Sequence, residues 1–383
     1  MSTTPQTATP ASASASVSAP KLLDRSDVRV KHAEGLGGSV SAFCSTTGVI
    51  ALGIVCVLMV GQIDLSVGSM SGFASAMVGV LWVNQGWPVL LAIVAALAVG
   101  GAIGALYALL FNRLGMPSFI ATLSGLLTIL GMQLYLLGAT GSINLPYEAQ
   151  LVNFGQSMVL PAVVSHVLAL LPGALMLVIG LRNRKRRQAV NLSAPSMGGM
   201  VVRAVLITVV LQAIVVYLHQ GRGVPLMFAL FLALAVAMDY ALRRTRWGRA
   251  MHAVGGNREA ARRSGINVNM IFMSAFVLCS SLAALGGVLT AARLASASQQ
   301  AGTGDVNLNA IAAAVIGGTS LFGGRGNAWS AVLGIIVIQS IASGLTLLNL
   351  SSSLRFMITG AVLAIAVIVD SLARRSRVSH GKA

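Results

Sequence analysis

Long apolar runs, one after another, constrain this chain more than any other feature of its sequence. Most have the roughly 20 residues that an α-helix needs to cross a bilayer. Backbone groups inside a bilayer must bond within their own segment or along the wall of a closed barrel, and these runs lack the period-2 alternation of barrel strands. We therefore expect an all-α polytopic membrane protein with about 10–11 transmembrane helices. The runs lie at roughly 43–61, 67–84, 88–111, 117–138, 158–181, 200–218, 224–242, 270–292, 309–322, 328–348 and 354–372.

The amino-acid composition excludes a soluble globular protein. Only 9% of the 383 residues are charged and 56% are hydrophobic, whereas soluble domains carry about 25% charged residues. A net charge of +17 would suggest nucleic acid in a soluble protein. Here the basic residues lie between apolar runs, so we expect them to set the orientation of the chain in the membrane and to contact anionic lipid, with no nucleic-acid partner. The three cysteines are scattered without CxxC spacing and predict neither a disulfide nor a metal site.

The chain divides into a tail, a membrane domain and a second tail. Residues 1–40 begin with a Ser/Ala/Thr/Pro-rich stretch and predict a disordered, low-complexity tail. Residues 41–373 form the transmembrane domain, with hydrophilic loops at 182–199 and 243–268, and 374–383 form a basic tail. Both loops and the basic tail are expected on the cytoplasmic side. The run 309–322 is short and glycine-rich, which predicts a broken or re-entrant helix.

The loop 243–268 concentrates charge as no other stretch of the chain does. Gly255-Gly256-Asn257 predicts a turn, followed by a short helix through Glu259-Ala260-Ala261 that Gly265 ends. Glu259 is spaced to pair with two arginines, at about 0.2–0.5 kcal/mol per pair. Two alanines after an acid give this helix a bare face suited to close contact with another protein. An ordinary positive-inside loop is the alternative reading.

Asp64 and Ser66 interrupt the first two apolar runs. A carboxylate costs about 2.5–3.5 kcal/mol at a helix centre in a membrane. It indicates either a polar break that lines or gates a pathway, or a capped helix start in which Asp64 accepts from Ser66 and Val67. Gln133 and Asn144 are further candidates to face a pathway, since sugars are held by polar groups that match their hydroxyls. Asp239 and Asp370 precede arginines and predict interfacial ion pairs.

Several strings together resemble the permeases of ABC importers, in their carbohydrate (ribose and xylose) branch, and most of all the xylose-type permeases. Glu-Ala-Ala at 259–261 with Gly265 resembles the coupling loop of that family, and the string 64–69 resembles a signature of the carbohydrate branch. The resemblance extends over about residues 45–372, nearly all of the membrane part. The xylose type is indicated by the stretch RNRKRRQAVNLSAPS and a following span. Further matching strings are 117–123, 217–225 and 314–324.

The resemblance implies a compact bundle that works as a homodimer in the bacterial inner membrane. It implies that Gly255, Gly256, Asn257, Glu259, Ala260, Ala261 and Gly265 form the loop that docks on an ABC ATPase subunit. Ala260, Ala261 and Gly265 are the expected contact residues. An external sugar-binding protein is the other implied partner. Relatives tend to have an acid–Leu–acid triplet where this chain has Asn307-Leu308-Asn309.

No nucleotide-binding motif occurs in the chain. We therefore expect a transport subunit and not an enzyme, with no catalytic residue, metal or cofactor of its own, and with ATP hydrolysed by a partner. The predicted function is import of a monosaccharide, with xylose as the leading sugar. An ion-coupled secondary transporter is the alternative, and it would need intramembrane carboxylates, for which Asp64 is the one weak candidate.

Overall fold

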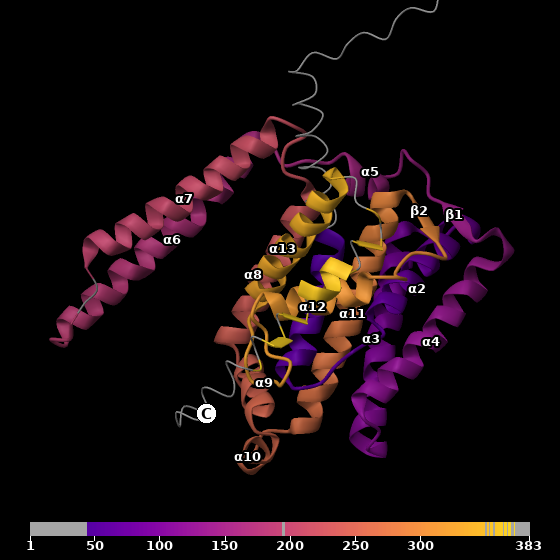
Figure 1. Cartoon of the computed structure of the whole chain (residues 1–383), viewed down its shortest axis with the longest axis horizontal. Helices are drawn as coiled ribbons and strands as arrows, with labels where there is room; N and C mark the ends of the chain where they lie inside the picture. Colours follow the sequence, from indigo (N-terminus) through magenta and orange to yellow (C-terminus); the bar gives the residue numbers. More distant parts are fainter. Residues whose placement is uncertain are drawn as a thin grey trace, which may run out of the picture.

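The computed structural model describes residues 44–193 and 196–348 together with 351, 353–354, 357–362, 364–365, 367–368 and 371. Within these residues the chain is almost entirely helical (Figure 1), which confirms the predicted all-α class. The predicted tails 1–40 and 374–383 lie outside the described residues, as does Asp370.

Eight helices in the described part of the chain are long and apolar enough to cross a membrane. Two other apolar helices are shorter: Cys44–Met59, as far as it is described, and α12 (Val306–Ile316). At 1.5 Å per residue α12 is about 16 Å long, half of a hydrocarbon core, so the predicted broken helix at 309–322 is confirmed. The eight are α2 with its π-helical end η1 (Val67–Gly79, Val80–Asn84), α3 (Val89–Leu114), α4 (Ser118–Leu137, continued by η2, Gly138–Thr140), α6 (Ala162–Ala189), α7 (Met197–His219), α8 (Leu226–Arg244), α11 (Val268–Leu294) and α13 (Ala328–Leu347).

Prolines fix where several of these helices begin. Pro88, Pro117, Pro161 and Pro225 are the N-caps of α3, α4, α6 and α8. Proline lacks an N–H and has a fixed φ, so it suits a helix start, where the first N–H groups have no intrahelical partner. The predicted start of α4 at residue 117 is confirmed to within one residue.

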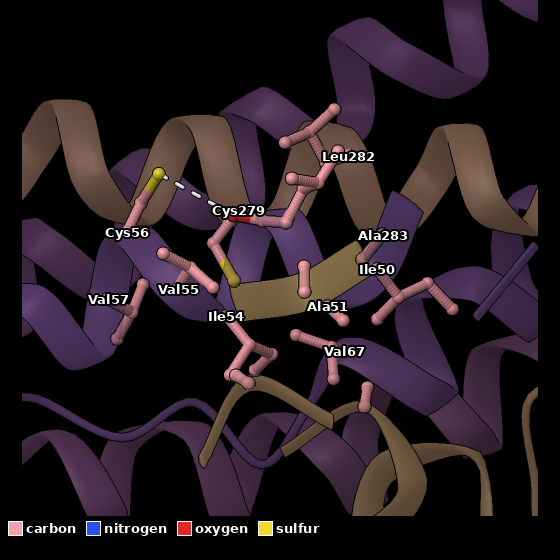
Figure 2. Packing of buried hydrophobic residues seen from close by; sticks show 14 of the residues in the cluster. Ile50, Ala51, Ile54, Val55, Cys56, Val57, Val67, Cys279, Leu282 and Ala283 are labelled. Carbon is pink, nitrogen blue, oxygen red and sulfur yellow. Dashed lines mark hydrogen bonds between the residues drawn. The ribbon is translucent and has the colours of Figure 1, made fainter. Parts of the chain in front are cut away.

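Helix α11 lies at the centre of the bundle, against α2, α3 and the helix Cys44–Met59. Figure 2 shows Cys279 and Ala283 of α11 facing Ile50 and Ile54 of that first helix. Small residues allow the close approach. A Cβ added at Gly100 would lie 2.9 Å from Ala284 Cβ on α11, and Gly104 meets the α11 backbone one turn away. The GxxxG spacing of α3 is therefore used as a helix contact.

A short antiparallel ribbon closes the end of the bundle opposite α9 and α10 (Figure 1). Strand β1 (Ser142–Asn144) pairs with β2 (Ser296–Ser298), with Ser142 opposite Ser298. The ribbon joins the segment after α4 to the end of α11, beside the short helix α5 (Gln150–Gln156). It brings two connections far apart in sequence into one surface.

Helices α6 and α7 form a hairpin that projects from the rest of the molecule (Figure 1). The predicted hydrophilic loop 182–199 is partly helical, because α6 continues to Ala189 and α7 begins at Met197. With 28 residues α6 is about 42 Å long, more than a bilayer core, so its basic last turns extend beyond the apolar layer. Within the hairpin, Gln212 Nε2 donates to His166 O at 2.9 Å, and His166 Nδ1 lies 2.7 Å from Gln212 Oε1.

Candidate functional site

The basic loop 243–268 folds into two short helices, α9 (Arg246–Gly256) and α10 (Arg258–Arg263). Each begins at a polar N-cap. Thr245 Oγ1 accepts from Gly248 N at 3.1 Å, and Asn257 Oδ1 accepts from Ala260 N at 2.9 Å. Caps of this kind stabilise a helix by about 1 kcal/mol. The short helix predicted through Glu259 is confirmed, and Asn257 is its cap.

The end of α10 is a Schellman motif built on Gly265. Gly265 has φ +85°, its N–H donates to Arg262 O at 3.0 Å, and Ile266 N donates to Ala261 O at 3.1 Å. Only glycine adopts this left-handed conformation without strain, so the prediction that Gly265 ends the helix is confirmed. Glu259 Oε1 lies 3.1 Å from an Arg262 nitrogen and 3.5 Å from one of Arg263, which confirms the predicted pairs.

Gly255 and Gly256 do not form the predicted turn. They are the last two residues of α9, and the chain turns at Asn257. The reason is packing: a Cβ at Gly255 would lie 2.5 Å from Gly324 N and closer still to Met59 O, whereas a Cβ at Gly256 would meet nothing within 4 Å. Gly255 is therefore required by a contact and not by a turn.

That contact is a junction of three backbone segments, which we call the glycine joint: Met59, Gly61, Gly255, Gly323 and Gly324. Gly324 N donates to Met59 O at 2.8 Å. A Cβ on Gly323 would lie 2.8 Å from Gly255 O and 2.9 Å from Gly61 N. The end of the first helix, the end of α9 and the connection after α12 thus meet with no side chain between them. Of the glycines in the 314–324 string, Gly323 and Gly324 serve this joint.

The exposed surface of α10 is narrower than predicted. Glu259, Ala260 and Gly265 are exposed, but Ala261 is only 4% exposed and packs within the chain. Ala261 is therefore revised from a contact residue to a packing residue, while Ala260 and Gly265 remain available to a partner.

Arg258 is a part of this site that the sequence did not mark. Its guanidinium carbon lies 5.2 Å from the ring centroid of Phe111 at the end of α3 and 4.5 Å from that of Phe272 in α11. Burial lowers the pKa of this guanidinium, which still keeps its charge. The start of α10 is thereby attached to two membrane helices. A lone arginine beside Glu259 gives no local signal, because its partners lie far away in sequence.

The predicted break at Asp64 is buried inside the protein. Asp64 is 1% exposed, and its Oδ1 accepts from Ser66 N at 2.8 Å and from Ser66 Oγ at 2.7 Å. Of the two bonds predicted for a capped helix start, only the one from Ser66 N forms, and the side chain of Ser66, the N-cap residue of α2, makes no capping bond. The second predicted donor, Val67 N, is replaced by the Ser66 hydroxyl.

Gln133 and Asn144 are not brought together with Asp64 in one polar surface. Gln133 is completely buried, and its Nε2 donates to Ser298 O and Ala301 O, both at 3.0 Å, and to Gln299 O at 3.3 Å. It therefore holds the connection after β2 and does not face a pathway within this chain. Asn144 is exposed at the end of β1, opposite Ser296. No group of three or more metal-binding side chains gathers among the described residues.

One family of membrane proteins accounts for most of the chain. The family described as "Branched-chain amino acid transport system / permease component" matches residues 38–367. The chain belongs to this family. The permease is thus a transport subunit and not an enzyme, as predicted, and with eight apolar spans in its described part it is a multi-pass protein of the inner membrane.

Curated relatives of the permease are named for sugars. It is 36% identical over 332 residues to the xylose transport system permease protein XylH of Escherichia coli (strain K12), covering 86% of this chain and 83% of that protein. It is 32% identical to the corresponding Haemophilus influenzae protein, covering 85% and 86%. The ribose import permease protein RbsC of E. coli (strain K12) is 31% identical, covering 85% and 83%. No solved structure matches the chain. The resemblance to ABC sugar permeases is confirmed.

Proposed function

We propose that this permease is the transmembrane subunit of an ATP-driven ABC importer that carries a monosaccharide, xylose, across the inner membrane. The sugar is supported by two relatives named for xylose, at 36% and 32% identity. The mechanism is supported above all by α10, a capped helix with an exposed face that is attached to the bundle on both sides. Because α10 is attached in this way, a force that a partner subunit exerts on it is transmitted to α3, α11 and α12.

The proposed partners follow from this role. A separate ABC ATPase subunit binds and hydrolyses ATP, and an external sugar-binding protein delivers the sugar. Two permease copies assemble in one transporter. The basic end of α6 meets anionic lipid headgroups, because several of its side chains are exposed cations beyond the apolar layer. Those cations are Arg182, Lys185, Arg186 and Arg187.

In the proposed mechanism the ATPase meets Glu259, Ala260 and Gly265. ATP binding by the partner favours one arrangement of the bundle over another, and it acts only through contacts that differ between the two arrangements. The glycine joint and Arg258 are the places where movement of α9 and α10 reaches the membrane helices. Asp64 and Ser66 fix the position at which α2 begins, beside the proposed pathway of the sugar.

An ion-coupled transporter is the rival function. Its requirement is a free carboxylate near the middle of the membrane. Asp64 is engaged by Ser66, and Asp239 Oδ1 pairs with Arg243 Nε at 2.7 Å, as predicted for an interfacial pair. The pair with Arg243 favours a structural role for Asp239, whereas Ser66 holds only Oδ1 of Asp64, whose Oδ2 is buried with no hydrogen-bond partner among the described residues.

The deciding experiment reconstitutes the permease with its ATPase and binding protein in vesicles and follows labelled xylose. We expect uptake that requires ATP and persists when the proton gradient is dissipated. Labelled ribose and allose, tested in the same vesicles, report the sugar preference. Uptake that follows the proton gradient without ATP would contradict the proposal, and a preference for another pentose or hexose would contradict xylose alone.

A further inference from the structure

Two membrane segments of this protein are interrupted, and the interruptions lie side by side. The chain is non-helical at 60–66, between the first helix and α2, and again at 299–305, between β2 and α12. Polar backbone inside a membrane protein is tolerated where it is buried in protein or lines a pathway. Discontinuous helices of transporters commonly mark the place where the pathway is controlled.

Asn307, in the first turn of α12, bonds to both sides of the other interruption. Its Oδ1 accepts from Gly68 N, and its Nδ2 donates to Leu65 O. Leu65 N in turn donates to Thr122 Oγ1 of α4 at 3.2 Å. One half-buried carboxamide therefore satisfies a donor and an acceptor of the break. We call Leu65, Gly68 and Asn307 the break junction.

Around the break junction the backbones are too close for any side chain. A Cβ at Gly302 would lie 2.5 Å from Gly72 N and 2.8 Å from Ser71 Oγ. A Cβ at Gly72 would lie 2.8 Å from Gln133 Cδ. In this closely packed region Asn307 bonds to the start of α2, and Gln133 of α4 holds the connection 299–305 through Ala301 O.

The two ends of α12 are held differently. Asn307 lies in its first turn, and the connection beyond its last turn reaches the glycine joint through Gly324 and Met59. The glycine joint also contains Gly255, three residues before the start of α10. Helix α12 therefore connects the coupling loop at one end with the break junction at the other, over about 16 Å.

We propose that Asn307 is a positioning residue for transport: its two bonds fix α12 to the start of α2, and they carry movement of α9 and α10 to the interruption at 60–66. The carboxamide is suited to this because it both donates and accepts. A leucine side chain of similar length does neither, and leaves Leu65 O without its donor and Gly68 N without its acceptor. This inference rests on the proposed function and adds a residue distant from the ATPase contact.

The test compares Asn307→Leu and Asn307→Ala with Asn309→Leu in the complete transporter. Asn309 is one half-turn further along α12, and its side chain bonds to Asp305 Oδ2 at 2.9 Å at the start of the same helix, so it controls for the same change of side chain in α12. Two quantities are measured per inserted transporter: ATP-driven xylose uptake, and ATP hydrolysis in the absence of sugar. A purely structural role would change the amount of inserted protein but neither quantity.

We expect both Asn307 variants to lose uptake by about tenfold, the size of one buried bond left unsatisfied, and to hydrolyse more ATP without sugar. Asn309→Leu keeps both quantities near those of the unsubstituted permease. Unchanged uptake and hydrolysis per inserted Asn307 variant would overturn the inference alone. Failure of Asn307→Ala to insert would also overturn it, since the bonds would then serve folding. Absence of ATP-driven uptake in the unsubstituted transporter would overturn the proposed function as well.

Discussion

Gly255 offers the sharpest prediction, because its neighbour Gly256 is a matched control in the same helix turn. Alanine is favoured over glycine inside helices by about 0.5–1 kcal/mol, so propensity alone predicts that either substitution stabilises α9. Packing predicts opposite signs. A Cβ at Gly255 would lie 2.5 Å from Gly324 N, and one at Gly256 would meet nothing within 4 Å.

The magnitude follows from the separation that alanine requires at position 255. Real Cβ contacts do not fall below 3.0 Å, so Gly324 must retreat by at least the difference from 2.5 Å. That movement pulls on the 2.8 Å bond from Gly324 N to Met59 O. Overpacking of this kind costs about 1–3 kcal/mol. After the gain in helix propensity we expect a net loss of about 1–2 kcal/mol for Gly255→Ala and none for Gly256→Ala.

The assay is twofold. Thermal unfolding of the purified permease in detergent reports stability, and ATP-driven xylose uptake per inserted transporter reports coupling. A loss of 1–2 kcal/mol in the glycine joint corresponds to a factor of about 5–30 in the population of the joined arrangement. We expect Gly255→Ala to unfold at lower temperature and to import several-fold less. Equal stability and equal uptake for the two alanine variants would refute the packing argument.

Three further predictions test other parts of the permease. Gly265→Ala forces a side chain into φ +85° and should destabilise the permease by about 1–2 kcal/mol, with Gly265→Asn less harmful. The midpoint of thermal unfolding measures this, and a midpoint of Gly265→Ala equal to that of the unsubstituted permease would contradict the argument from backbone strain. Arg258→Gln removes a charge from two rings and should cost about 0.5–1 kcal/mol or more. Arg262→Gln removes only an exposed ion pair and should cost about 0.2–0.5 kcal/mol. A larger loss of stability for Arg262→Gln than for Arg258→Gln in the same unfolding assay would contradict the role of Arg258 in attaching α10 to the membrane helices. Gln212→Leu removes two bonds to His166 and should weaken the α6–α7 hairpin by about 0.6 kcal/mol. The expected result is faster proteolytic cleavage between the two helices, and an unchanged rate of cleavage would contradict this prediction.

Local signals were sufficient for the spans and for α10. Apolar length, prolines ahead of helices and the Asn257 and Gly265 caps act within a few residues, so the sequence alone predicts them. The same holds for the short α12, since its length is visible in the sequence.

Long-range packing explains what the sequence could not predict. Gly255 looks like a turn residue until Met59 and Gly324 are placed against it, and Ala261 looks like a contact residue until α10 is laid on the bundle. Gln133 was expected at a pathway, but its amide holds three carbonyls of a distant connection. In each case the deciding partner lies tens to hundreds of residues away and leaves no periodic or spacing signal.

The central claim is that α10 couples ATP hydrolysis in a partner to transport through this permease. The most direct test measures ATP hydrolysed per xylose imported for Ala260→Glu, an exposed alanine on α10, and for Ala139→Glu, an exposed alanine in η2, three residues before β1. Neither site is packed, so both variants should insert normally. The account predicts that Ala260→Glu loses import or spends far more ATP per sugar, while Ala139→Glu behaves as the unsubstituted permease. An unchanged ratio and rate for Ala260→Glu would contradict it.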